Sequence, residues 1–153
     1  MPFEISSIAT VYNQRIDISD DLWGEVISEI VLNDTLPAEA LDGIEDFSHL
    51  EIIFVFDRAI SAPVVTGSEH PRENKAWPKT GIFAQRKKNR PNHIGTTICE
   101  LIRREGKSLF VKNLDALDGT PVVDIKPVMK EFLPRSAVKQ PAWTHELMKD
   151  YWK

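Results

Sequence analysis

Six short segments rich in Ile, Val and aromatic residues do most to limit the folds open to this chain. Each is bounded by turn-forming residues, a pattern typical of β-strands. The helical period appears only in residues 142–152, where aromatic and long apolar side chains share one broad face. The six strand-like segments are residues 4–12, 24–32, 50–56, 96–103, 107–114 and 121–125.

Many short strands with one terminal helix favour a closed, mostly antiparallel sheet over a doubly wound α/β layer. We therefore predict a mostly β protein: one closed β-barrel of largely antiparallel strands with a short C-terminal helix, in a single domain over residues 1–153. Glu105-Gly106 predicts a hairpin between two of the strands. Pro37 predicts the start of a short helical turn. Residues 58–78 carry three prolines and no sustained period, which predicts an active-site loop or an interface arm.

The composition indicates a cytoplasmic globular protein. The one cysteine, Cys99, excludes an intramolecular disulfide framework, and its place inside a strand predicts a buried small side chain. The N-terminus lacks the features of a signal peptide, and no stretch is long enough to cross a bilayer. The histidines lack metal-ligand spacing. We expect a cytoplasmic protein with no membrane association and no metal.

The net charge of −4 is the sum of two unlike parts. Residues 1–60 carry thirteen Asp and Glu against Arg15 and Arg58, a net of −11, whereas residues 61–153 carry ten acids against seventeen bases, a net of +7. A locally positive face attracts nucleic acid through counterion release. The alternative is that the two parts interleave in the fold and neutralise each other.

Residues 81–95 place four cationic side chains within five residues, between two apolar segments. Guanidinium groups suit carboxylates and phosphates, Pro91 stiffens the backbone, and Asn92 tolerates a turn conformation. This pattern predicts a binding loop held between strands. For the Lys87-Lys88 pair, a solvated surface is the alternative to contact with RNA phosphates.

Residues 113–127 form a second constellation, in which Asp118-Gly119 favours a tight turn and exposed amides around Gly119 and Thr120 suit an adenine or carboxylate edge. The alternative is a plain turn joining two strands. The chain has no Gly-x-Gly and no P-loop, so a nucleotide-like ligand needs other means of binding.

Three blocks of residues, in this order, resemble the TsaA/TrmO family (YaeB-like), and the resemblance covers about residues 4–132. The blocks are Phe47-Ser48-His49-Leu50 with Ile53-Phe54-Val55-Phe56, Gly81-Ile82-Phe83-Ala84-x-Arg86 with Arg90-Pro91-Asn92-x-Ile94-Gly95, and Leu114-Asp115-x-Leu117-Asp118-Gly119-Thr120-Pro121-Val122-Val123-Asp124-Ile125-Lys126-Pro127. The resemblance implies a β-barrel methyltransferase that uses S-adenosylmethionine and acts as a homodimer. It also implies N6-methylation of threonylcarbamoyl-adenosine next to the anticodon of transfer RNA.

The expected site residues fall into three groups. Asp118 and Asp124 are candidate proton acceptors, because the attacking nitrogen loses a proton when it is methylated. RNA contacts are expected from Lys87, Lys88 and Lys126. The expected cofactor-binding residues are His49, Phe83, Arg86, Arg90, Asn92, Leu114, Asp118, Gly119 and Thr120. For Phe83 the alternative is core packing, and for His49 it is a hydrogen-bonded structural role.

The sequence departs from the family pattern at three places. His93 stands where Pro is usual, Val128 replaces an aromatic residue, and the N-terminal block is reduced to residues 9–15. These departures bear on the acceptor. Two alternatives therefore stand beside the transfer RNA methyltransferase: a noncatalytic barrel that binds the cofactor or RNA, and a methyltransferase acting on a small molecule.

Overall fold

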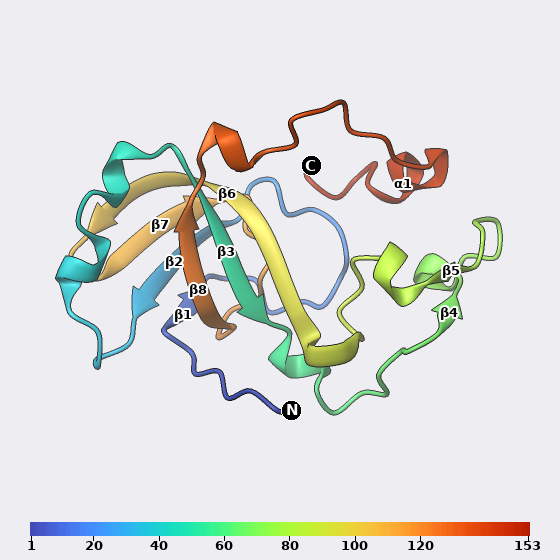
Figure 1. Cartoon of the computed structure of the whole chain (residues 1–153), viewed down its shortest axis with the longest axis horizontal. Coiled ribbons are helices and arrows are strands. Elements are labelled where there is room, and N and C mark those ends of the chain that lie inside the picture. Colours follow the sequence, from blue (N-terminus) through green and yellow to red (C-terminus); the bar gives the residue numbers. More distant parts are fainter.

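A closed six-stranded antiparallel barrel forms the body of the protein, as the sequence predicts (Figure 1). The computed structural model describes residues 1–153, the whole chain. Around the barrel the strand order is β1-β2-β7-β6-β3-β8, and β8 pairs back with β1. The barrel strands are β1 (Ala9–Tyr12), β2 (Ile27–Leu32), β3 (His49–Val55), β6 (Ile94–Glu105), β7 (Ser108–Lys112) and β8 (Pro121–Pro127).

Alternation of apolar and polar residues along the strands builds one core inside the barrel. On β3 the side chains of Leu50, Ile52 and Phe54 are buried, while the residues between them face outward. Cys99 on β6 is fully buried in the same cluster, which confirms its predicted role as a small core residue. The hairpin at Glu105-Gly106 is also confirmed, and Gly106 takes the positive φ of 60° that its turn requires.

The ends of several elements differ from the sequence-based prediction. The first strand begins at Ala9 and not at residue 4, because the register with β2 and β8 starts at Ala9. Before it, Ile8 still donates to the Val122 carbonyl oxygen of β8 at 2.8 Å. The α-helix, α1 (Ala142–Leu147), is shorter than the expected 142–152. Residues 148–152 form turns instead, because the backbone carbonyl groups of Asp150 and Tyr151 accept hydrogen bonds from residues 22 and 23.

The segment with three prolines forms an arm beside the barrel, under α1 in Figure 1. Its strand β4 (Ser68–Glu69) pairs with β5 (Thr80–Gly81), which follows directly after the segment, in a two-stranded sheet that is separate from the barrel. Trp77 of the arm stacks against Trp143 of α1 with ring centroids 6.1 Å apart, and its Nε1 donates to Glu146 at 2.7 Å. The arm therefore holds the C-terminal helix.

Seven short 3-10 turns complete the fold. No helix of the structure is long and apolar enough to span a membrane. The turn at Ala38–Leu41 follows Pro37 as predicted. The others are Ile44–Asp46, Asp57–Ala59, Pro71–Glu73, Ile82–Ala84, Pro91–His93 and Lys130–Phe132.

Acidic and basic parts of the sequence interleave in this fold. Around the barrel, β1 and β2 of residues 1–60 are followed by β7 and β6 of residues 61–153, and β3 of the first part lies between β6 and β8 of the second. Ion pairs also join the two parts: Arg72 with Asp21 at 3.0 Å, and Arg104 with Asp42 at 3.1 Å. The interleaving alternative is confirmed, so the charge difference between the two parts does not by itself create a positive half of the molecule.

Candidate functional site

The cationic segment and the Asp-Gly bend lie at the same end of the barrel. Gly95 on β6 and Val122 on β8 both pair with Phe54, on the two sides of β3. Neighbouring strands are about 4.8 Å apart, so these two positions are about 10 Å apart. The cationic residues end at Arg90, five positions before Gly95, and the Asp-Gly bend ends at Gly119, three positions before Val122. We call this end of the barrel the mouth.

Residues 113–120, here called the mouth loop, cross the mouth from β7 to β8. Leu114 and Ala116 point into the core and are buried. Asn13 secures the loop, because its Nδ2 donates to the Ala116 carbonyl oxygen at 2.9 Å and its backbone N–H donates to Asp118 Oδ1 at 3.0 Å. From the end of β3, Arg58 donates to the Asp118 carbonyl oxygen at 2.9 Å.

The turn at Gly119 is built into the barrel. Gly119 has a φ of 85°, which other residues adopt only with strain. Its N–H donates to Val11 at 2.7 Å, and the N–H of the buried Thr120 donates to Leu117 at 3.1 Å. These two amides already have protein acceptors, so the turn is structural even though it borders the mouth.

The cationic segment is held against the start of β6. Arg86 Nη2 donates to the Thr96 carbonyl oxygen at 2.6 Å, at a point where β6 has not yet begun to pair with β7. Arg90 Nη1 donates to Gln85 at 2.6 Å within the segment. Lys87 pairs with Glu69 at 2.6 Å, whereas Lys88 makes no ion pair.

Phe83 lies on the surface of this segment. Its side chain is 77% exposed, so the core-packing alternative is wrong. The Arg90 guanidinium carbon lies 5.9 Å from the centroid of the Phe83 ring, within the range of a cation–π contact. An exposed aromatic face beside a guanidinium suits a planar base.

Two consecutive residues at the start of β6 have a strained backbone. Asn92 has a φ of 67° and His93 a φ of 51°, in the left-handed region where each non-glycine residue costs about 1–3 kcal/mol. The predicted turn at Asn92 is therefore present. His93 is buried, and its Nε2 has no hydrogen-bond partner. Strained and unpartnered groups of this kind gather at functional sites.

A carboxylate that the sequence reasoning left without a role lies in the mouth. Asp115 accepts hydrogen bonds from the hydroxyl groups of Thr97 on β6 and of Tyr151 near the C-terminus. Burial and the Asp115 carboxylate raise the pKa of Tyr151, while the nearby Arg86 cation opposes this shift. Only the position of Asp115 within the third sequence block could have singled it out.

Two of the expected residues, His49 and Lys126, lie away from the mouth, whereas Asp124 lies close to it on β8. His49 is exposed at the opposite end of β3, six residue steps or roughly 20 Å from Val55, and its Nδ1 is 2.7 Å from Ser48 Oγ. On β8, Asp124 pairs with Ile53 of β3, one residue from Phe54, and Lys126 pairs with Glu51 of β3. The side chains of Asp124 and Lys126 form an ion pair at 2.9 Å. That contact raises the pKa of the Lys126 ammonium group.

The mouth therefore gathers groups that suit an anionic or nucleoside-like ligand. Phe83 offers an aromatic face, Arg86 and Arg90 offer guanidinium groups, and Asp115 offers a carboxylate. The same end of the barrel is bordered by the mouth loop and by three residues of the cationic segment. The expected residues of the mouth loop are Leu114, Asp118, Gly119 and Thr120, and those of the cationic segment are Lys87, Lys88 and Asn92. The structure brings together no group of three His, Cys, Asp or Glu residues that could hold a metal ion.

Several curated proteins resemble this chain. A human protein named tRNA (adenine(37)-N6)-methyltransferase is 39% identical over 105 residues, which cover 69% of this chain and 23% of the human protein. A Pyrococcus abyssi protein named as a probable S-adenosyl-L-methionine-binding protein is 39% identical over 102 residues, covering 67% of this chain and 53% of the archaeal protein. The chain thus spans about a quarter and about half of the lengths of these relatives.

Solved structures and a family match agree with these similarities. The crystal structure of TrmO from Pseudomonas aeruginosa superimposes with a TM-score of 0.74 at 26% identity, covering 94% of this chain and 62% of that one. Residues 7–132 match the family described as the tRNA-methyltransferase O N-terminal domain. Because the match spans most of the chain and includes every barrel strand, this protein belongs to the TrmO family.

Proposed function

We propose that this protein is an S-adenosylmethionine-dependent methyltransferase that modifies N6 of an adenine in transfer RNA. The observation that carries this proposal is the convergence of the cationic segment and the mouth loop on one end of the barrel. The names of the human and archaeal relatives support the reaction and the cofactor. For the acceptor we propose threonylcarbamoyl-adenosine next to the anticodon.

The residues of the mouth fit this cofactor. Phe83 is exposed and can stack on the adenine, while Arg86 and Arg90 lie beside it and can pair with the carboxylate. When bound, the cofactor supplies an activated methyl group on a sulfonium. The protein's main task is to hold the acceptor nitrogen in line with that group, and such positioning is worth up to ~7–11 kcal/mol.

A carboxylate can accept the proton that the acceptor nitrogen loses. Of the two candidates, Asp118 borders the mouth, where the Asn13 N–H holds its Oδ1. Asp124 lies on β8 in an ion pair with Lys126. Because the Asp124 carboxylate is already engaged by Lys126, we assign the proton to Asp118.

A homodimer would explain the division of the expected residues into two groups. His49 and Lys126 lie away from the mouth of their own barrel, where a second copy can meet them. Ile98 and Ile102 on β6 are exposed apolar residues that a partner could cover. Light scattering coupled to size exclusion should show a dimer at micromolar concentration, and a strictly monomeric species would refute this part of the proposal.

The methyltransferase is tested with purified protein, S-adenosylmethionine and transfer RNA with or without the threonylcarbamoyl group. Methyl transfer should require the modified RNA, and Arg90→Ala should abolish it while circular dichroism stays unchanged. Arg135→Ala, an exposed position on the segment before α1, is the matched control and should remain active.

Each contrary outcome identifies one of the alternatives. Cofactor binding without a methylated product would favour the noncatalytic barrel. Methylation of a free nucleoside in preference to RNA would favour the small-molecule enzyme. Full turnover by Arg90→Ala would show that the cationic segment is not part of the site. We further propose a cytoplasmic location, which a free buried Cys99 and a transfer RNA substrate both suit.

A further inference from the structure

The last residues of the chain cover part of the mouth. After α1 the chain turns back, and residues 148–153, here called the strap, run alongside residues 22–24 (Figure 1). The N–H groups of Leu22, Trp23 and Gly24 donate to carbonyl oxygens of Asp150, Tyr151 and Lys153 at 3.1, 2.8 and 3.3 Å. The Tyr151 hydroxyl then reaches Asp115.

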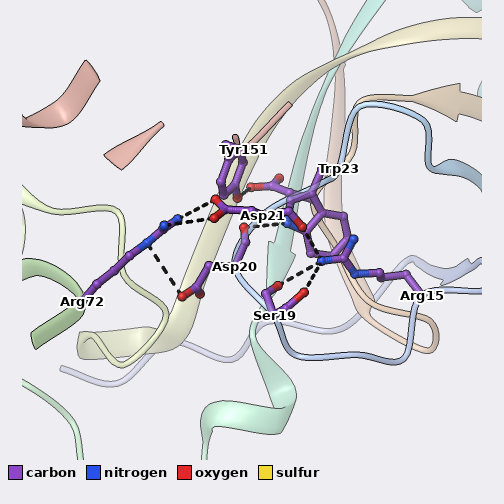
Figure 2. A network of polar contacts seen from close by, with 8 residues as sticks. Arg15, Ser19, Asp20, Asp21, Trp23, Arg72 and Tyr151 are labelled. Carbon is purple, nitrogen blue, oxygen red and sulfur yellow. Dashed lines mark hydrogen bonds and ion pairs between the residues drawn. The ribbon is translucent and has the colours of Figure 1, made fainter. Parts of the chain in front are cut away.

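The surface on which the strap lies is built by other residues. Arg15 donates to the carbonyl oxygens of Leu22 at 2.9 Å and Asp21 at 2.6 Å, and its guanidinium lies 4.0 Å from the Trp23 ring centroid. Arg72 of the arm pairs with Asp21 from the other side. Figure 2 shows this network, with Tyr151 beside it. Residues 22–24 are therefore held in place by contacts that do not involve the strap.

The connection to the strap is weakly packed. Residues 131–142 are all exposed, and none of them belongs to the buried core of the barrel. The contacts of α1 are with the arm through Trp77. The strap can consequently leave residues 22–24 while α1 stays in place.

Gly24 is the position that admits the strap. A Cβ atom at this residue would lie 2.0 Å from the Trp152 carbonyl oxygen and 2.8 Å from its carbonyl carbon, and the other close atom also belongs to the strap. Gly24 has no positive φ, so alanine fits its backbone conformation. Alanine here would exclude the strap and leave the barrel contacts unchanged.

We propose that the strap is releasable, and that the Asp115 carboxylate beneath Tyr151 binds a ribose hydroxyl of the nucleoside cofactor once the strap has moved. This inference rests on the proposed function. A phenol and a ribose hydroxyl are both O–H donors to a carboxylate, so Tyr151 occupies the acceptor that the ligand would use.

Calorimetric titration with S-adenosylmethionine tests the competition. Gly24→Ala and Tyr151→Phe should each bind with a Kd lower by about tenfold, because a closed state that excludes the ligand reduces its apparent affinity. Gly67→Ala is the matched control, since a Cβ there meets no atom within 4 Å. Asp115→Asn added to Gly24→Ala should remove the gain.

Hydrogen exchange gives a second readout that does not depend on catalysis. The amides of Leu22, Trp23 and Gly24 should be protected in the free protein and should lose protection when the cofactor saturates it. Increased protection would overturn the proposal, because the strap would then be a fixed wall of the site. If Gly24→Ala does not fold, the affinity of Tyr151→Phe and the exchange measurement still test whether the strap is released.

The affinities also separate this inference from the function on which it rests. Equal, measurable Kd values for all variants would overturn the strap and leave the methyltransferase intact. Failure of every variant to bind S-adenosylmethionine would overturn both.

Discussion

Gly95 shows at the residue scale that a position within a sequence motif can be needed for packing and not for contact with a ligand. It ends the cationic block, and a Cβ atom there would lie 2.6 Å from two carbons of the Phe54 ring and 2.8 Å from Phe56 Cζ. The two rings pack edge to face, with centroids 5.2 Å apart. The glycine thus lets β6 lie directly on this aromatic pair below the mouth.

Gly95→Ala should consequently destabilise the fold by about 1–3 kcal/mol through overpacking of rings that cannot both move. Urea unfolding followed by fluorescence measures the loss. Gly67→Ala, in open space, should show no loss. Equal midpoints for the two variants would mean that the ring pair has room that the structure does not show.

Cys99 is a second residue whose chemistry follows from its surroundings. Burial, with a smaller contribution from the Asp115 carboxylate, raises the pKa of its thiol to about 12. The neutral thiol is favoured in the fold, so its contribution to stability is complete below the unfolded pKa of about 8.5 and is lost as pH rises toward 12.

At pH 8 the folded protein should therefore resist iodoacetamide, and the urea-unfolded chain should be alkylated, as measured by mass spectrometry. The matched control is Ile98→Cys combined with Cys99→Ala, because Ile98 is the neighbouring residue and is 45% exposed. This variant should react while folded. Comparable rates for the folded wild type and the control would contradict the burial of Cys99.

At the scale of elements, the mouth loop depends on a single side chain for much of its placement. Asn13 Nδ2 donates to Ser28 Oγ and to Ala116, each at 2.9 Å, and its Oδ1 accepts from the Arg15 N–H at 2.9 Å. These bonds connect β2, the backbone at Arg15 and the mouth loop.

Asn13→Ala should cost about 1–3 kcal/mol in unfolding free energy, because the fully buried Ser28 hydroxyl and the Ala116 carbonyl lose their donor. Amide exchange in residues 113–120 should also become faster. Gln14→Ala, at the adjacent exposed position, should change neither quantity. Unchanged exchange in Asn13→Ala would show that Arg58 and Gly119 hold the loop unaided.

At the scale of the whole molecule, positive and negative charges are mixed and are not separated into two halves. The net charge of −4 and the interleaved ion pairs leave no positive half, so an attraction for RNA depends on cations that have no acidic partner. Lys88 is such a cation at the mouth, whereas Lys87 is paired with Glu69.

Lys88→Ala should lower the slope of log K against log salt by roughly 0.7 for a single-stranded anticodon loop, the value for one lost phosphate contact. Fluorescence anisotropy with a labelled anticodon stem-loop over a range of salt concentrations measures it. Lys139→Ala, on the exposed segment before α1, should leave the slope unchanged. Identical slopes for both variants would exclude Lys88 from the RNA interface.

Strand identity, the hairpin at Gly106 and the burial of Cys99 were predictable, because hydrophobic period and turn propensity act over a few residues. The short first strand and the early end of α1 were not. Both depend on partners far along the chain, on β8 in one case and on residues 22–24 in the other.

By itself, the sequence determined a closed antiparallel barrel and the two blocks of residues that border its mouth. Only the tertiary structure decided that Phe83 is exposed, that His49 lies at the far end of β3, and that Asp115 meets Thr97 and Tyr151. Local pattern cannot specify such partners, because contacts between distant residues exist only after the barrel closes and the tail turns back on it.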